Sequence, residues 1–246
     1  MIATPAWPPK SMSRLYVEGP LGEGATVTLD GAQANYLGNV MRLKEGDAAL
    51  LFDGANGEWL ARVVEAGKKR MVLVLAEQTR PQETVPELVL AFAPVKRTQT
   101  DWLVEKATEL GIARLQPVMT RRTVAERVKL ERLHSITVEA AEQCNRTSLP
   151  LIDEPLSLDA FLKGRDPART LYFADENGGE PAASAVRPGP ATILTGPEGG
   201  FTDEERMAIR AQPNVIALSL GPRILRAETA ALAAITAWMS VAGDWK

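Results

Sequence analysis

From residue 87 onward, short apolar runs alternate with stretches of helical periodicity, and this pattern leaves few folds open to the chain. Runs of five or six residues rich in apolar and β-branched side chains have the composition of buried strands. Strands that are joined through helices pair in parallel, so the alternation predicts a mostly parallel α/β sheet. The strand-like runs are 88–93, 114–118, 170–174, 191–195 and 215–220, and the helical stretches are 98–110, 128–143, 158–162, 203–211 and 228–241.

The first 80 residues have a different pattern, in which short strand-like runs are separated by turn sequences such as Glu45-Gly46-Asp47 and Asn56-Gly57. Several short strands at this spacing indicate a small β-barrel. Two prolines among polar residues follow at 81–86 and indicate a linker. We therefore expect a disordered extension over residues 1–12, a β-barrel domain over 13–80, a linker over 81–86 and an α/β domain over 87–246.

The chain has one cysteine, Cys144, and one histidine, His134. A lone cysteine cannot form an internal disulfide, which suits a cytoplasmic protein. Zinc sites need several cysteine or histidine ligands, so we expect no metal. No apolar stretch is long enough to span a bilayer, and we expect no membrane association. Catalysis must therefore use carboxylates, arginines, backbone dipoles or a cofactor.

The net charge of −3 alone argues weakly against a nucleic-acid partner. The charges are unevenly distributed, however, because residues 94–146 contain ten basic and seven acidic side chains and are the only part with a basic excess. Phosphate binding depends on local basic patches, so the acidic total does not exclude RNA.

The sharpest motif is the sequence Leu-Thr-Gly-Pro-Glu-Gly-Gly-Phe-Thr-Asp-Glu-Glu at 194–205. An apolar strand leads into a glycine-rich turn, and Thr202 with Glu205 then predicts a capping box that starts a helix. Ligands of open α/β sheets bind beyond the carboxyl ends of strands, where this turn lies. The motif has neither the lysine of a phosphate loop nor the glycine spacing of a dinucleotide fingerprint. The alternative is an ordinary tight turn between a strand and a helix.

The second motif, at 218–230, again has a strand that ends at a Gly-Pro turn, here followed by two arginines and a glutamate. We expect the two turns to end adjacent strands. The helix that follows, 229–239, is apolar nearly all round, and such a helix must be buried on all sides. At a chain terminus this predicts burial against a second copy in a homodimer, the alternative being an ordinary core helix.

Together these segments resemble the knotted SPOUT superfamily of methyltransferases, and within it they are closely similar to the ribosomal RNA uridine N3-methyltransferases of the RsmE family. The similarity extends to Val-Met-Arg-Leu at 40–43, to Asp-Trp-Leu-Val-Glu-Lys-Ala-Thr-Glu-Leu-Gly at 101–111, to Arg-Arg-Thr-Val at 121–124 and to the segment 139–146. The motifs occur in family order, from about residue 13 to the end of the chain.

The resemblance implies an α/β domain with a trefoil knot, preceded by a PUA-like barrel that holds RNA. It implies that S-adenosylmethionine methylates N3 of a uridine in 16S ribosomal RNA of the small subunit. The cofactor would lie between the two turns, where glycines let the backbone approach it closely. The implied cofactor-binding residues are Leu194, Thr195, Gly196, Pro197, Glu198, Gly199, Gly200, Leu218, Ser219, Leu220, Gly221, Ile224, Leu225, Thr229 and Ala230.

For the chemistry we expect the Arg226 guanidinium to stabilise the uridine anion that forms as N3 loses its proton. Arg223 and Glu228 are expected to orient it, and the alternative is that Arg226 pairs with Glu228 and only holds the turn. His134 falls within a helical stretch and is not expected to be the base. The expected RNA-binding residues are Arg14, Arg42, Lys106, Arg121, Arg122 and Arg146, although each could instead belong to a solvated face or pair with glutamates one helical turn away.

Two other functions are weighed against a methyltransferase. A non-catalytic RNA-binding assembly factor is disfavoured because the motif residues are intact. These are Gly196, Gly199 and Gly200 in the first turn and Arg223, Arg226 and Glu228 after the second. A nucleotide-dependent oxidoreductase is disfavoured because the dinucleotide fingerprint is missing. Binding measurements with S-adenosylmethionine and with NAD would separate the three.

Overall fold

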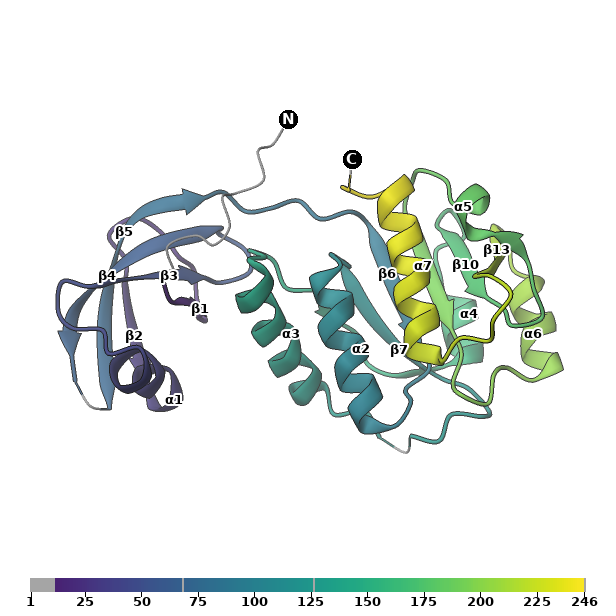
Figure 1. Cartoon of the computed structure of the whole chain (residues 1–246), viewed down its shortest axis with the longest axis horizontal. Coiled ribbons are helices and arrows are strands. Elements are labelled where there is room, and N and C mark those ends of the chain that lie inside the picture. Colours follow the sequence, from purple (N-terminus) through teal and green to yellow (C-terminus); the bar gives the residue numbers. More distant parts are fainter. Residues whose placement is uncertain (1–11, 68, 126, 246) are drawn as a thin grey trace. The chain divides into compact units, whose positions relative to one another are not determined.

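A computed structural model describes residues 12–67, 69–125 and 127–245, and these form two compact units (Figure 1). The first unit contains the chain up to Glu83 together with Asn145–Ser148, and the second contains Thr84–Cys144 and the chain from Leu149 onward. The segment at 145–148 thus joins the first unit, although the sequence predicted it within the second. Residues 1–11 of the expected extension lie outside the described residues.

The first unit is built on a five-stranded sheet with the order β1-β3-β4-β5-β2. The buried apolar side chains of its strands form one core. Before Met41 the chain forms a short α-helix and a π-helical turn. The elements are β1 (Arg14–Tyr16), β2 (Thr26–Asp30), α1 (Gly31–Asn35), η1 (Tyr36–Val40), β3 (Ala48–Phe52), β4 (Glu58–Ala66) and β5 (Arg70–Arg80).

A buried ionic cluster lies in this unit around Glu58, which is 4% exposed. Its carboxylate accepts hydrogen bonds from Arg14 Nε at 2.5 Å and from Arg80 Nη2 at 2.6 Å. Arg14 also donates to the carbonyl oxygen of Arg146, and its guanidinium lies 3.9 Å from the centre of the Phe52 ring. The Arg14 and Arg146 side chains are buried, so neither guanidinium is accessible to an RNA phosphate. This corrects the expectation that both contact RNA.

The ionic cluster makes the stability of the protein depend on pH. Burial raises the pKa of the Glu58 carboxyl, but hydrogen bonds and charges from Arg80 and Arg14 outweigh burial and lower the pKa to about 2. A depressed carboxyl pKa stabilises the fold above the unfolded pKa of about 4.3, and this contribution is lost as the pH falls towards 2. We therefore expect the melting temperatures of wild type and Glu58→Gln to differ most at neutral pH and to converge only as the pH falls from about 4 towards 2. Calorimetry measures both, with the exposed Glu77→Gln as control, and a gap that persists at the lowest pH would contradict the assignment.

The second unit contains a parallel sheet with the order β11-β13-β10-β12-β6-β7-β8, and β9 pairs with β7. This confirms the predicted parallel α/β sheet. The two glycine turns follow β12 and β13, which are not adjacent because β10 lies between them, so that expectation was wrong. The strands are β6 (Leu88–Phe92), β7 (Arg114–Met119), β8 (Leu151–Ile152), β9 (Leu156–Ser157), β10 (Thr170–Ala174), β11 (Glu180–Pro181), β12 (Ala191–Thr195) and β13 (Val215–Ser219).

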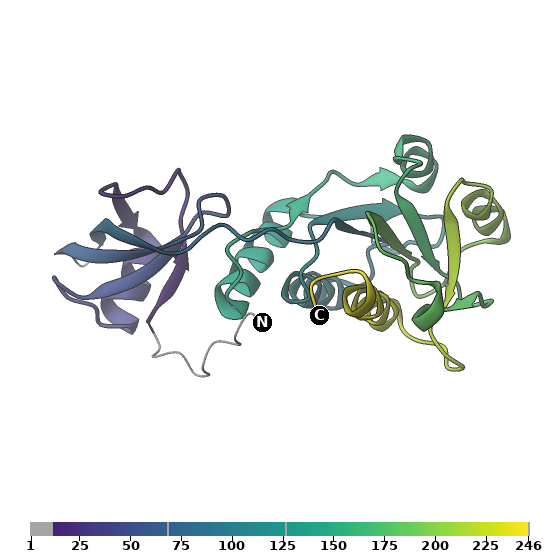
Figure 2. The same ribbon diagram turned by 90° about the horizontal axis from the view of Figure 1, so that it is seen from above.

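Helices cover both faces of this sheet, as the view in Figure 2 shows. Side chains of β6 alternate between the two layers, since Leu90 and Phe92 belong to one core cluster and Ala91 to the other. The first layer contains α2 (Arg97–Glu109), α3 (Leu130–Cys144), α5 (Ala182–Ala185) and α7 (Ala227–Val241), and the second contains α4 (Leu158–Gly164) and α6 (Asp203–Arg210). No helix within the described ranges is long and apolar enough to cross a membrane.

The last helix, α7, buries only one of its faces within the chain. Ala231, Ala234 and Trp238 are buried in the core, whereas Thr236 and Ser240 on the opposite face are exposed. A single chain therefore leaves one face of this helix uncovered, which disfavours the alternative of an ordinary core helix, and burial against a second copy stays a prediction. The outward face has small, uncharged side chains: Thr229, Ala233, Thr236, Ala237 and Ser240.

Candidate active site

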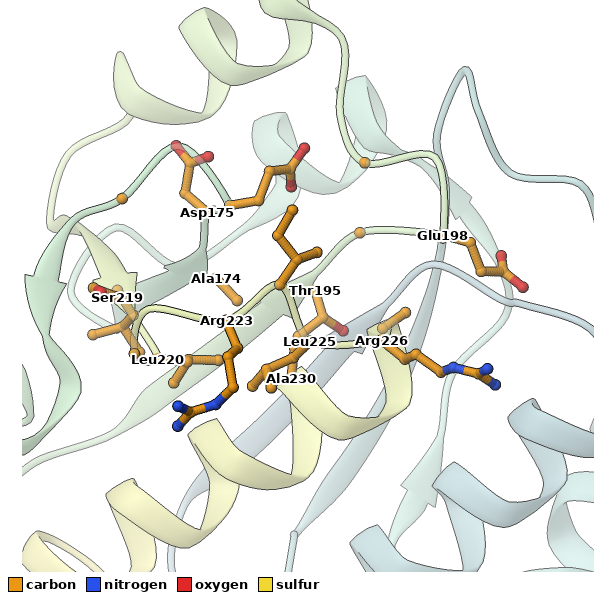
Figure 3. A pocket seen from close by; sticks show the side chains of 18 of the residues that line it. Ala174, Asp175, Thr195, Glu198, Ser219, Leu220, Arg223, Leu225, Arg226 and Ala230 are labelled. Atoms are coloured by element: carbon orange, nitrogen blue, oxygen red, sulfur yellow. The ribbon is translucent and has the colours of Figure 1, made fainter.

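A cavity of about 510 Å³ lies at the carboxyl ends of three neighbouring parallel strands, β13, β10 and β12 (Figure 3). Loops that leave parallel strands in the same direction meet at one edge of the sheet and enclose a ligand there. The first wall is formed by residues 174–178 after β10, the second by 195–200 after β12, and the third by 218–227 after β13. Ala230, on the first turn of α7, completes the lining.

Most of the residues expected to bind the cofactor line this cavity. Leu194 does not, because it is fully buried in the core on the α6 side of the sheet, and Thr229 lies on the exposed face of α7. Of the three expected catalytic residues, Arg223 and Arg226 line the cavity and Glu228 does not. The expected cofactor residues in the lining are Thr195, Gly196, Pro197, Glu198, Gly199, Gly200, Leu218, Ser219, Leu220, Gly221, Ile224, Leu225 and Ala230.

Two of the three glycines of the second wall, Gly196 and Gly200, stand where a side chain does not fit. A Cβ atom on Gly196 would lie 2.7 Å from Cε2 of the Phe201 ring, which is 1% exposed. Gly200 has φ +66°, and a Cβ there would lie 2.2 Å from Oε1 of Glu176. Positive φ and close approach are both conditions that only glycine meets at low cost. The backbone of this loop is thereby brought to the edge of the cavity.

The sequence analysis missed the first wall, which carries two carboxylates, Asp175 and Glu176. Arg206 of α6 donates to Asp175 Oδ1 at 2.5 Å, to Glu176, and to the carbonyl oxygen of Phe201 at 3.1 Å. Arg210 donates to the other Asp175 oxygen at 2.6 Å. Burial lowers the pKa of Arg206, but its carboxylate partners outweigh burial and raise the pKa, so the guanidinium stays charged. Arg206 therefore links the first wall, through Asp175 and Glu176, to Phe201 at the end of the second wall.

The segment that contains Arg121 and Arg122 lies against the start of α6 and the second wall. The predicted capping box is confirmed, with Thr202 accepting a hydrogen bond from the Glu205 amide and Glu205 accepting one from the Thr202 amide. The other Glu205 carboxylate oxygen accepts a hydrogen bond from the Arg121 amide at 2.8 Å. Arg122 Nη1 donates to the carbonyl oxygen of Gly199 at 2.7 Å. Two of the expected RNA-binding residues thus lie directly beside the cavity loop.

Arg223 and Arg226 stand exposed at the mouth of the cavity, and their side chains point in different directions in Figure 3. Neither guanidinium makes a hydrogen bond or ion pair with any described residue. Arg226 therefore does not pair with Glu228, which is 8% exposed at the start of α7. This disfavours the alternative in which Arg226 only holds the turn.

The remaining expected RNA-binding residues have different surroundings. Lys106 pairs with Glu105 and Glu109 at 2.7 Å each, and these hydrogen bonds raise its pKa. Arg42 is exposed in the first unit and has φ 60°.

His134 lies on α3 and does not line the cavity. Among the residues with assigned positions, no group of three His, Cys, Asp or Glu side chains could hold a metal ion.

Comparison with known proteins identifies relatives over most of the chain. A family model described as an RNA methyltransferase domain matches residues 81–239, and one described as an RNA methyltransferase PUA domain matches residues 29–76. The Rickettsia conorii protein named ribosomal RNA small subunit methyltransferase E is 34% identical over 91% of this chain and 93% of its own length. The protein of the same name from Synechocystis is 36% identical over 86% of this chain and 72% of its own length.

Two solved structures agree closely with this one. Ribosomal RNA small subunit methyltransferase E from Neisseria gonorrhoeae, bound to S-adenosylmethionine, has a TM-score of 0.87, 28% identity and coverage of 96% of this chain and 100% of its own. A Legionella pneumophila putative methyltransferase in complex with the same cofactor has a TM-score of 0.85, 29% identity and coverage of 95% and 99%. These likenesses confirm the predicted fold class, a SPOUT-type knotted α/β domain preceded by a small PUA-like domain.

Proposed function

Because this chain belongs to the family of the ribosomal RNA small subunit methyltransferases E, we propose that it methylates N3 of a uridine in 16S ribosomal RNA of the small subunit. It is an RNA methyltransferase that uses S-adenosylmethionine. The observation that carries the proposal is the cavity at the carboxyl ends of β10, β12 and β13, which is lined by the glycine-rich loop after β12 and by the Gly-Pro turn after β13. The single cysteine suits a cytoplasmic location.

The residues of the cavity fit this cofactor. The second wall is largely backbone, because a Cβ at Gly196 would overlap the Phe201 ring and a Cβ at Gly200 would overlap the Glu176 carboxylate, and backbone amides and carbonyls can hydrogen-bond an adenine ring. Leu220, Leu225 and Ala230 provide apolar surface opposite that wall. When bound, the cofactor supplies an electrophilic methyl group on its sulfonium sulfur.

The protein's part in the reaction is to make the uridine imide lose its proton. Arg226 lies at the mouth of the cavity without a partner among the described side chains, so its guanidinium can donate hydrogen bonds to one carbonyl oxygen beside N3 and leave N3 itself open to the methyl group. These bonds strengthen as negative charge develops there, which lowers the free energy of releasing the N3 proton to solvent water without a dedicated protein base. Arg223, which also lines the mouth of the cavity, is assigned a role in orienting the substrate, whereas the expected orienting role of Glu228 is dropped because Glu228 neither lines the cavity nor pairs with Arg226.

Binding of the cofactor is expected to stabilise the fold. At a hundredfold excess over the dissociation constant, the free energy of unfolding should rise by roughly 2.7 kcal/mol. For a chain of this size that is a melting shift on the order of 5–10 °C. Differential scanning fluorimetry measures it, with NAD as the control ligand. A shift with NAD and none with millimolar S-adenosylmethionine would contradict the assignment.

The substrate is tested by mapping modified nucleotides. Mass spectrometry of 16S ribosomal RNA from cells lacking this protein should show one N3-methyluridine missing. The purified protein should then restore it from S-adenosylmethionine, with naked RNA and assembled small subunits offered in parallel. An unchanged modification pattern would refute the proposed substrate.

We further propose that the enzyme is a homodimer, with the outward face of α7 packed against a second copy. Small side chains let two helices approach closely, and this face carries no charge. Thr236→Arg is therefore expected to give a folded monomer in light scattering at micromolar concentration. Ala208→Arg, on the exposed face of α6, is the matched control and should leave the dimer intact. Ala234 is unsuitable for this test because it is buried within its own chain.

A further inference from the structure

A second cavity of about 350 Å³ lies in the second unit, where the chain leaves β6 and enters α2. Its described lining residues combine apolar side chains with a set of cations and one carboxylate. The apolar lining includes Val95, Val124, Val128 and Leu133, the cations are Lys96, Arg97, Arg127, Lys129 and Arg132, and the carboxylate is Asp101.

The charges in this second cavity are poorly balanced. Asp101 pairs with Arg132 at 2.5 Å and lies 3.9 Å from Arg97, so one carboxylate serves two guanidiniums. The side chains of Lys96 and Lys129 are exposed and have no ion-pair partner in the part of the chain that the structure describes. A concave surface lined by one sign of charge attracts anions.

The backbone adds to this positive potential. Lys96 is the N-cap of α2, a helix of 13 residues, and its side chain makes no capping hydrogen bond. The first turn of α2 has no acidic residue to neutralise the helix dipole. The amino terminus of such a helix favours a negatively charged ligand.

A short segment joins this cavity to the cofactor cavity. Arg122 donates to the carbonyl oxygen of Gly199 in the cofactor loop. Two residues later, Val124 lines the second cavity and is 75% exposed. Exposed apolar surface beside unpaired cations suits a ligand with both an apolar face and negative charges, which describes a nucleotide chain.

We propose that the second cavity binds phosphodiester groups of the RNA substrate, beside the nucleotide that is methylated. The inference rests on the proposed function, since it assigns the RNA a path from the cofactor loop across residues 121–125 to Lys96 and Lys129. The lysines hold phosphates, and the valines cover the face of a neighbouring ribose or base. The alternative ligand is an acidic protein segment, and the test must distinguish it from RNA.

The test compares two double variants that remove the same charge. Lys96→Gln/Lys129→Gln alters the cavity, and Lys163→Gln/Arg187→Gln alters two exposed cations of the same unit outside it. The probes are 16S ribosomal RNA transcribed in vitro and a polyglutamate peptide. Fluorescence anisotropy from low to high salt gives the affinities, and calorimetry gives S-adenosylmethionine binding and the melting temperature.

The cavity variant should bind the RNA on the order of tenfold more weakly at physiological salt, with a salt dependence shallower by roughly 1.4 in log–log slope. The control variant should behave as wild type, and cofactor binding and melting should be unchanged in both. A cavity variant with the wild-type salt slope would overturn the inference, as would a loss of affinity confined to polyglutamate. If wild type transfers no methyl group to the RNA but only the cavity variant loses affinity, the proposed function fails and the RNA site stands.

Discussion

Replacing Arg226 with alanine is expected to lower the rate of methyl transfer by about 10²–10³-fold, the scale for removing one donor that stabilises a developing anion. Binding of S-adenosylmethionine and the oligomeric state should not change, because the guanidinium is exposed at the cavity mouth and bonds to no described residue. Single-turnover assays with labelled cofactor measure the rate, and calorimetry measures cofactor affinity.

The pH dependence separates this role from a structural one. Raising the pH ionises more of the uridine imide in advance, so part of the loss in Arg226→Ala should be recovered at alkaline pH. A variant that merely deforms the loop would not regain rate in this way. His134→Ala is the control and should retain full activity, since His134 lies on α3 away from the cavity lining. A comparable loss in that variant would replace the arginine proposal with a histidine base.

Gly196→Ala is expected to weaken cofactor binding by about 10–100-fold, the range for forcing one methyl group into a packed site. The new Cβ would lie 2.7 Å from Cε2 of the Phe201 ring. That ring is buried and packs edge-on against Phe173 with centroids 5.2 Å apart, so the loop must move instead. Isothermal titration with S-adenosylmethionine measures the effect.

Two further variants make this prediction specific. Gly199→Ala belongs to the same loop, but its Cβ would lie at an ordinary 3.4 Å from Arg122 side-chain atoms, so near-normal affinity is expected. Adding Phe201→Leu to Gly196→Ala removes the clashing atoms and should recover part of the affinity. Failure of that rescue, with the fold intact, would show that the clash is not the cause.

The local features of the fold could be predicted from the sequence because they depend on neighbouring residues. The Thr202–Glu205 capping box is one example, since both partners lie within one turn of α6. The run at 191–195 is another, because five consecutive buried side chains require a strand covered on both faces. The positions of the two glycine turns followed directly from the ends of such strands.

The features that were missed depend on strand order and burial. Asp175 follows a strand-like run just as the glycine turns do, yet only the position of β10 between β12 and β13 brings it into the cavity wall. Arg14 was read as a surface cation because its partner, Glu58, lies 44 residues away. A charge is visible in a sequence, but its burial is a property of the packed fold.

The fastening of the first wall to the second by Arg206 has an entropic consequence. Those two walls are already held together before any ligand binds, whereas no side chain of residues 219–226 makes a hydrogen bond to a described residue. The conformational entropy that the cofactor must remove is therefore concentrated in this third wall. Arg226 belongs to the same segment, so the ordering of the wall by the cofactor also orders the arginine. We therefore expect the RNA to bind more tightly to the cofactor-bound enzyme than to the free enzyme.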